Sequence, residues 1–218
     1  MTTFVLVHGA WYGSWAWDRV VPLLEREGAK TLTPDLTHAV DAGLHTHVEE
    51  VVAELDRADD VVLVGHSYAG LVVREAADLR PGRVKHIVLI EGWAGPDGTS
   101  LFDLAPEGFV DVIRAWAGAD GAIPAPAPER FGITDPKDAR WLAERLRPQF
   151  LRTFTEATRL SGAVDTIPGT GIFCRPQMLP FEWMAVSLGY RPIGLDGPHD
   201  LMLTAPQSIA DVLLAAAG

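Results

Sequence analysis

The feature that most constrains this chain is an alternation of short β-branched runs with amphipathic helical patterns. The six runs, each bounded by Gly, Asp or Pro, are Thr3–Val7, Thr31–Pro34, Val61–Val64, Val84–Ile90, Gly171–Cys174 and Arg191–Leu195. The helical patterns are Trp17–Glu27, Thr46–Leu55, Ala69–Leu79 and Ser208–Ala217. Strands that alternate with helices pair in parallel, because each helix carries the chain back across the sheet. The sequence therefore predicts an α/β fold with about six parallel strands.

One connection is much longer than a crossover requires. About 80 residues separate the fourth run from the fifth, where a crossover needs only about a dozen. Helical patterns recur inside it at Asp138–Leu146 and Phe150–Leu160, and the Pro-rich stretch Gly121–Pro128 is expected to form neither helix nor ladder strand. We therefore expect a single domain over residues 1–218, with a helical cap inserted at about 95–165.

Composition excludes several classes of partner. The 218 residues carry a net charge of −11 that is spread along the chain, without the clustered Lys and Arg that nucleic acid requires. Cys174 is the lone cysteine, so no intrachain disulfide forms, and no apolar run approaches the roughly 20 residues of a membrane helix. The N-terminus lacks the pattern of a signal peptide. We expect a soluble, cytoplasmic protein with no nucleic-acid or membrane partner.

The strongest chemical signal is the hexapeptide Gly65-His66-Ser67-Tyr68-Ala69-Gly70. It follows the third strand directly and precedes an apolar helix, which is the context of a nucleophile elbow. Such an elbow is a strained turn that exposes a nucleophilic hydroxyl, here that of Ser67, and it needs small neighbours. Ala69 stands where a second glycine is usual, and we expect its methyl group to be tolerated.

A second motif, His8-Gly9-Ala10-Trp11, ends the first strand. The backbone N–H groups of Ala10 and Tyr68 are expected to face a developing oxyanion together. His8 lies too early in the chain to be the expected base, and we interpret it as a buried histidine bonded to backbone.

These motifs resemble those of small α/β-hydrolases, similar to plant methyl-salicylate esterases and hydroxynitrile lyases and to their bacterial esterase-like relatives. The resemblance covers nearly the whole chain, through Val5–Trp17, Thr46–Val48, Gly65–Gly70, Pro96–Phe102, Asp138–Leu160 and the loop of His199. It implies an α/β-hydrolase fold of six parallel strands with a helical cap, with Ser67 as nucleophile and His199 as base. It implies no cofactor.

His199 lies in Gly197-Pro198-His199-Asp200, just past the last strand, where this fold places its base. Its competitors have other interpretations. His38, His45 and His47 crowd a short segment, but no thiolate or fixed ligand spacing supports a metal, and we expect solvated loop histidines. His86 begins a strand and is interpreted as structural.

The acid of the triad departs from the family pattern. The relatives place it after the fifth strand, in a segment similar to Cys-Thr-Glu-Asp, whereas this chain has Cys174-Arg175-Pro176-Gln177 and no carboxylate. Glu91 ends the fourth strand, in a segment that looks like that of haloalkane dehalogenases with a glutamate acid there, and it is our candidate. A structural Glu91 stays an alternative, with Asp97, Asp196 and Asp200 as weaker acids.

Aromatic residues near the strand ends and in the cap predict an apolar pocket, with Trp11, Trp93, Phe102 and Trp116 as candidate lining. The resulting hypothesis is a serine hydrolase of a carboxylic ester or lactone of a hydrophobic small molecule, with a homodimer left open. Two alternatives remain. One is a lyase, cyclase or isomerase that uses the same serine and histidine, and the other is a small-molecule binding protein without turnover.

Overall fold

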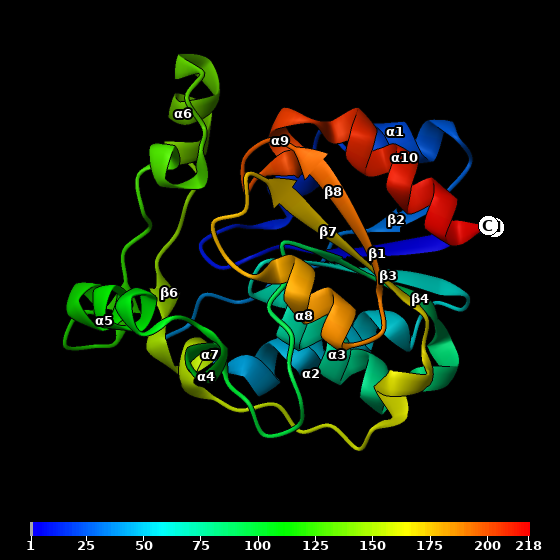
Figure 1. Ribbon diagram of the computed structural model, residues 1–218, viewed down its shortest axis with the longest axis horizontal. Coiled ribbons are helices and arrows are strands. Elements are labelled where there is room, and N and C mark those ends of the chain that lie inside the picture. Colours follow the sequence, from blue (N-terminus) through cyan, green and yellow to red (C-terminus); the bar gives the residue numbers. More distant parts are fainter. Residues whose placement is uncertain (1) are drawn as a thin grey trace.

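The computed structural model describes residues 2–218 and contains the predicted parallel sheet (Figure 1). Its strands run in the order β2-β1-β3-β4-β7-β8, and every pair is parallel. The strands are β1 (Thr3–Val7), β2 (Lys30–Leu32), β3 (Val61–His66), β4 (Val84–Ile90), β7 (Gly169–Arg175) and β8 (Arg191–Asp196). The predicted α/β fold with six parallel strands is therefore confirmed.

Helices cover both faces of this sheet. In Figure 1, α2 (Leu44–Leu55), α3 (Ala69–Leu79) and α8 (Phe181–Ser187) lie below the sheet, and α1 (Val21–Arg26), α9 (Leu201–Thr204) and α10 (Pro206–Ala217) lie above it. The expected helix at Trp17–Glu27 is in fact a 3₁₀ turn at Ser14–Trp17 followed by α1, whose second residue is Pro22. A proline is favoured in the first turn of a helix, where its missing N–H costs nothing, so it marks the start of α1.

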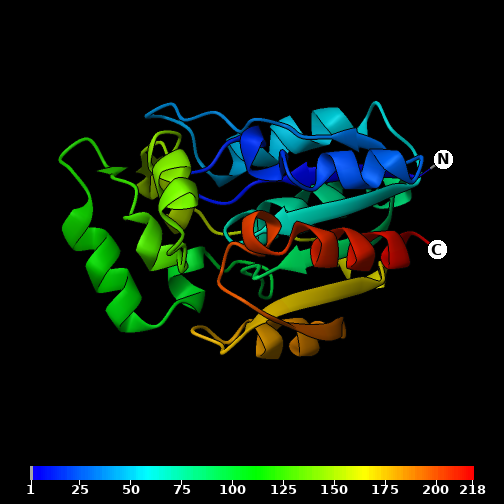
Figure 2. The ribbon, with the colours of Figure 1, turned by 90° about the horizontal axis from the view of Figure 1, so that it is seen from above.

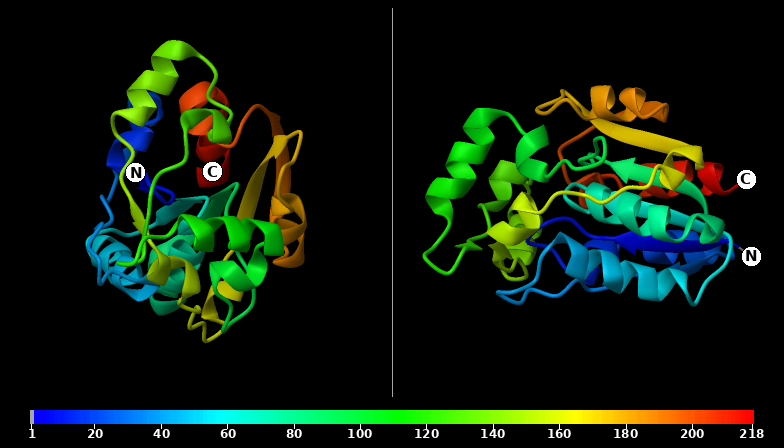
Figure 3. Two further views of the ribbon diagram at one scale, coloured as in Figure 1. Left: turned by 90° about the vertical axis from the view of Figure 1, so that its left-hand side faces the viewer. Right: turned by 90° about the horizontal axis from the view of Figure 1, so that it is seen from below.

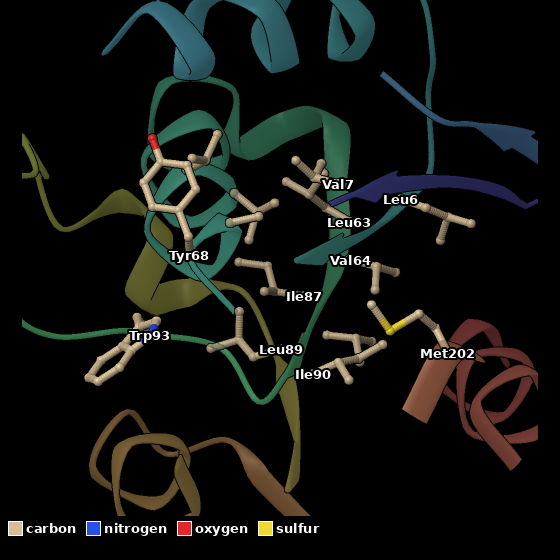
Figure 4. Packing of buried hydrophobic residues seen from close by; sticks show 14 of the residues in the cluster. Leu6, Val7, Leu63, Val64, Tyr68, Ile87, Leu89, Ile90, Trp93 and Met202 are labelled. Atoms are coloured by element: carbon tan, nitrogen blue, oxygen red, sulfur yellow. The ribbon is translucent and has the colours of Figure 1, made fainter. Parts of the chain in front are cut away.

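Side chains alternate between the two faces of the sheet because a strand has a period of two (Figure 4). Val64 and Ile90 lie on the side of Met202 in α9, whereas Leu63 and Leu89 lie on the opposite side, with α3. All five side chains are almost completely buried. A sheet covered on both faces gives near-continuous apolar strands, which is why the sequence runs were easy to recognise.

Most of the segment between β4 and β7, residues 101–155, lies at the carboxyl edge of the sheet, opposite the two chain ends (Figure 2). Its last part returns along α3 to the amino end of β7. Its elements, which the two views of Figure 3 show from other sides, are α4 (Leu101–Leu104), α5 (Glu107–Trp116), β5 (Ala122–Ile123), a 3₁₀ turn (Pro128–Phe131), α6 (Pro136–Ala143), β6 (Gln149–Phe150), α7 (Leu151–Thr155) and a 3₁₀ turn (Ala163–Thr166).

Two expectations for this segment are wrong in detail. The Pro-rich stretch contains a short strand, because Ala122 and Ile123 precede its first proline and pair with Phe150 and Gln149. Phe150–Leu160 is helical only over α7. Beyond α7 the backbone N–H of Arg159 is bound by Glu75 of α3, so a contact with the core replaces the helical bond.

The order of the strands also determines where a ligand can bind. From β1 the chain moves to β2 on one side, and then to β3 on the other side of β1. The loops that follow β1 and β3 therefore diverge and leave a crevice at the carboxyl ends of the two strands. Figure 2 shows the segment between β4 and β7 next to that edge. Within residues 2–218, no helix has the length and apolar character needed to cross a membrane.

Candidate active site

Ser67 occupies the turn between β3 and α3 in a left-handed backbone conformation, with φ +52°. This conformation is strained for a residue with a side chain, and it persists only where the surroundings enforce it. Close packing leaves no room for side chains around the turn: a Cβ atom at Gly65 would lie 2.8 Å from the carbonyl oxygen of Ala69, and one at Gly9 would lie 3.1 Å from Cβ of Ser67. Ala69 itself is fully buried without disrupting the turn.

Backbone hydrogen bonds fix the turn to the end of β4. The N–H of Ser67 donates to the carbonyl of Ile90 at 3.0 Å, and the N–H of Trp93 donates to the carbonyl of Ser67 at 3.0 Å. The two residues that these bonds flank are Glu91 and Gly92. The position of Glu91 is therefore set by the same backbone contacts that hold Ser67.

Glu91 is the first residue after β4, and its backbone is also left-handed, with φ +47°. Its N–H donates to the carbonyl of Ile172 in β7, and its side chain is almost completely buried. One carboxylate oxygen accepts the N–H of Cys174 at 2.7 Å, and the other lies 3.2 Å from Nδ1 of His199. Buried carboxylates need such partners, and both oxygens of Glu91 have one.

His199 follows β8, and its side chain retains about a fifth of its exposure. Because a carboxylate only accepts, Nδ1 carries the proton in the bond to Glu91, which leaves Nε2 as the basic nitrogen. Burial opposes the protonated form. The hydrogen bond to Glu91 and the charges of Asp200 and Glu91 outweigh burial and raise the pKa of His199. Ser67, Glu91 and His199 line one cavity.

The other candidate acids lie elsewhere. Gln177 is exposed and donates its amide to Glu182 at 2.8 Å, away from the imidazole. Asp97 accepts the N–H of Leu160, and Asp196 is exposed at the end of β8. Of the carboxylates weighed in the sequence, Glu91 is the one that hydrogen-bonds the ring of His199.

Ala10 and Tyr68, whose backbone N–H groups are the expected oxyanion donors, lie beside the same cavity. Ala10 follows β1 and Tyr68 precedes α3, and both residues line the cavity that contains Ser67. Within residues 2–218, neither N–H donates to a protein acceptor. The first N–H groups of a helix have no partner within it, so the N–H of Tyr68 is free to bind an oxyanion.

The cavity has a volume of about 360 Å³ and mostly apolar walls. Three of the four aromatic residues expected there, Trp11, Trp93 and Trp116, line it. Phe102 does not belong to this lining. Its ring packs edge-on against the ring of Phe154, with centroids 6.0 Å apart, and the guanidinium of Arg114 lies over it. Phe102 therefore contacts a lining residue rather than the cavity itself. The expectation for Phe102 is therefore wrong.

Several lining residues had no distinguishing sequence pattern. The rings of Phe131 and Phe181 both stack near the imidazole of His199, with ring centroids 6.4 and 6.1 Å away. Arg130 adds a cation to the lining, and Phe154 lies between the cavity and Phe102. Each of these residues is indistinguishable from ordinary core or surface in the sequence, because only the folded chain brings it to the strand ends.

The remaining histidines have structural environments. His8 is buried, accepts the N–H of Leu36 and bonds the carbonyl of Gly9, as expected. The interpretation of His47 as a solvated loop residue is wrong, because it lies in α2, is 2% exposed and bonds the hydroxyl of Tyr68 at 2.9 Å. His47 lies one helical turn from the apolar residues Leu44 and Val51, so it belongs to the buried face of α2.

One group in the described part of the chain has the spacing of a metal site. Donor atoms of His66, His199 and Asp200 lie within 4.8 Å of one another. His199 already donates to Glu91, His66 bonds the carbonyl of His199, and Asp200 accepts from a tyrosine, so each side chain has a protein partner. We assign these residues no metal.

Comparison with known proteins identifies the family of this chain. The model of the alpha/beta hydrolase family matches residues 4–212. A carbendazim hydrolyzing esterase of Nocardioides sp. (strain SG-4G) is 29% identical over 99% of both chains. An alpha-hydroxynitrile lyase of Arabidopsis thaliana is 33% identical over 54% of this chain and 48% of its own, so the chain matches about half of that plant protein.

A solved structure supports the fold alone. An extracellular alpha/beta-hydrolase from a Paenibacillus species, described as sharing homology with tobacco salicylic acid binding protein 2, superposes with a TM-score of 0.90. It is 23% identical and covers 99% of each chain. The family match extends over almost all of the chain, from β1 to α10. This protein therefore belongs to the alpha/beta hydrolase family, as an esterase-like hydrolase.

Proposed function

We propose that the protein hydrolyses a carboxylic ester or lactone of a hydrophobic small molecule through an acyl-enzyme on Ser67. The observation that carries this proposal is the hydrogen bond between Glu91 and Nδ1 of His199, in a cavity that Ser67 also lines. Nucleophile, base and acid are the three groups that acyl transfer by a serine requires.

In the proposed reaction, Nε2 of His199 removes the hydroxyl proton of Ser67 as its oxygen attacks the carbonyl carbon. The N–H groups of Ala10 and Tyr68 stabilise the oxyanion. The imidazolium then donates its proton to the departing alkoxide, which leaves an acyl group on Ser67. The carboxylate of Glu91 holds the imidazole through Nδ1 and stabilises the imidazolium that forms. Water, activated by His199, hydrolyses the acyl-enzyme and regenerates Ser67.

The cavity supports an apolar acyl or alcohol group as substrate. Its walls include the rings of Trp11, Trp93, Phe109 and Phe181, and its volume of about 360 Å³ suits a small molecule. Trp116 is partly exposed at the rim, where it can contact a bound substrate and the solvent. We therefore expect aromatic or cyclic esters to be preferred over short linear ones.

Intact-protein mass spectrometry tests this proposal. The protein is mixed with a chromogenic 4-nitrophenyl ester and quenched in acid within the first turnovers, and a second sample receives a fluorophosphonate. We expect a mass increase equal to the acyl group in the first sample and to the phosphonyl group in the second. The Ser67→Ala variant is the control and should gain neither. Failure of the wild-type protein to be labelled would contradict a serine hydrolase.

A lyase is the second candidate, and the similarity to an alpha-hydroxynitrile lyase favours it. In that reaction the same serine and histidine would move protons without forming a bond to the substrate. The two candidates differ in the same experiment, because a lyase releases its products with no acyl-enzyme. Turnover of a cyanohydrin with no ester hydrolysis and no acyl adduct would favour the lyase.

A further inference from the structure

A second carboxylate lies behind the proposed base, on the side chain of Asp200. Asp200 directly follows His199 and is completely buried. Its Oδ2 accepts a hydrogen bond from the hydroxyl of Tyr12, at an O···O distance of 2.5 Å. Its Oδ1 lies 3.8 Å from Nε2 of His66, at the end of β3. Asp200 therefore lies between Tyr12, in the loop after β1, and His66, the last residue of β3 before Ser67.

His66 connects this carboxylate to the backbone of the base. Its Nε2 lies 3.3 Å from the carbonyl oxygen of His199, which can only accept, so Nε2 carries the proton. The two imidazole rings lie 4.7 Å apart with an interplanar angle of 47°. Burial, with the charge of His199 next in importance, lowers the pKa of His66, so His66 stays neutral and keeps this tautomer. The hydrogen bond from His66 thereby fixes the carbonyl group of His199.

The arrangement is costly for folding. Within residues 2–218, Oδ1 of Asp200 and Nδ1 of His66 are buried without a hydrogen-bond partner. Each such group costs roughly 1–3 kcal/mol. Asp200 also precedes α9, where an aspartate commonly caps the first N–H groups, yet its side chain does not cap that helix. A carboxylate that gives up a favourable position for a costly one requires another explanation.

We propose that Asp200, hydrogen-bonded by Tyr12 and next to His66, is a positioning residue that fixes the backbone of His199 and places a second negative charge beside its imidazole. Glu91 orients the ring through Nδ1, whereas Asp200 acts on the loop and through its charge. The inference rests on the proposed role of His199 as base. It assigns Asp200 no contact with substrate.

The charge of Asp200 depends on pH. Burial raises the pKa of Asp200 to about 6, against the opposing effects of the charge of His199 and the hydrogen bond from Tyr12. The titratable groups around it are Tyr12 from the loop after β1, His66 from β3, Cys174 from β7 and its neighbour His199. Below its pKa Asp200 is neutral, so its support for the imidazolium is present only above about pH 6.

The test compares three variants in an assay with a chromogenic ester from pH 5 to 9. In Asp200→Asn, the amide oxygen can still accept from Tyr12, but the charge is removed. We expect kcat to fall roughly tenfold at pH 7.5 with KM unchanged within about twofold, because ground-state binding is untouched. The pH at which kcat/KM reaches half its maximum should move lower, since the imidazolium loses a favourable charge.

Tyr12→Phe supplies a second test that retains the charge. Loss of the hydroxyl removes a bond that favours the ionised form of Asp200, so the pKa of Asp200 should rise further. We expect a deficit in kcat near pH 6–7 that recovers by pH 9. The matched control is Asp196→Asn, which removes an exposed carboxylate from the same connection and should change neither kcat nor the profile.

The outcomes separate this inference from the proposed function. If Ser67→Ala keeps its turnover, the serine hydrolase is wrong and the role of Asp200 is overturned with it. If Ser67→Ala is inactive but Asp200→Asn has the wild-type kcat and profile, only the role of Asp200 is overturned. If Asp200→Asn does not fold, Tyr12→Phe decides alone, because a uniform loss at every pH would contradict the charge that we assign.

Discussion

The ends of β4 and β7 lie side by side in the sheet, yet they contribute different groups to the site. Ile90 and Ile172 are paired in register, so the residues that follow them start from the same edge. The β4 end contributes the carboxylate of Glu91 to His199, and the β7 end contributes the N–H of Cys174 to that carboxylate. Relatives that the sequence resembles carry their acid after the strand corresponding to β7.

With Glu91 as the proposed acid, this difference means that the fold specifies a position for negative charge more strictly than a position in the sequence. A side chain from the end of either strand can reach the same histidine, because the carboxyl ends of neighbouring parallel strands meet at one edge. The left-handed backbone of Glu91 turns its side chain toward β7, where the N–H of Cys174 orients it. The proposed role of Glu91 thus accounts for the missing carboxylate at the end of β7.

Moving the acid from one strand end to the other should have the largest effect on activity. We expect the double variant Glu91→Gln with Gln177→Asp to remain about 10³-fold or more below the wild-type kcat/KM, because Gln177 is exposed and faces Glu182. Steady-state kinetics with a chromogenic ester measures this. Recovery of the double variant to within tenfold of wild type would show that the β7 end serves equally well.

The second largest effect is expected where the end of β4 contacts the turn of Ser67, and it should reduce stability. A methyl group at Gly70 would overlap the carbonyl oxygen of Trp93 and lie 2.9 Å from its nitrogen. We expect Gly70→Ala to reduce the free energy of unfolding by about 1–3 kcal/mol and to reduce activity as well. Urea denaturation measures the first. Gly82→Ala is the control, because a methyl group there has no neighbour within 4 Å.

Changing the side chain at the β7 end should have the smallest effect. The Cys174 thiol donates to the carbonyl of Pro198 at 2.8 Å, and burial raises its pKa, so it stays protonated. We expect Cys174→Ala to cost about 1 kcal/mol of stability and to leave kcat/KM within about threefold, because the N–H to Glu91 is retained. A loss of activity as large as that of a Glu91 variant would refute a purely backbone role for Cys174.

Much of this organisation could be predicted from the sequence, for identifiable reasons. Buried parallel strands are continuous apolar runs, and the hexapeptide around Ser67 is constrained by its small residues, so both were recognisable. The strand at Ala122–Ile123 was missed because two residues carry no periodic pattern. The aromatic environment of His199, with Phe131 and Phe181 beside the imidazole, is formed by segments distant in the chain, and no local spacing encodes it.

The measurement that tests the central claim most directly is the pH dependence of kcat/KM for Glu91→Gln, with Gln177→Ala as control. Glutamine keeps the shape of Glu91 but removes its charge. Activity should fall about 10²- to 10⁴-fold. The hydrogen bond that His199 donates to Glu91 helps to raise the pKa of His199, so the residual activity should reach its half-maximum at lower pH than in the wild type. Gln177→Ala should match wild type. Full activity in Glu91→Gln, or a comparable loss in Gln177→Ala, would contradict the assignment of Glu91 as the acid.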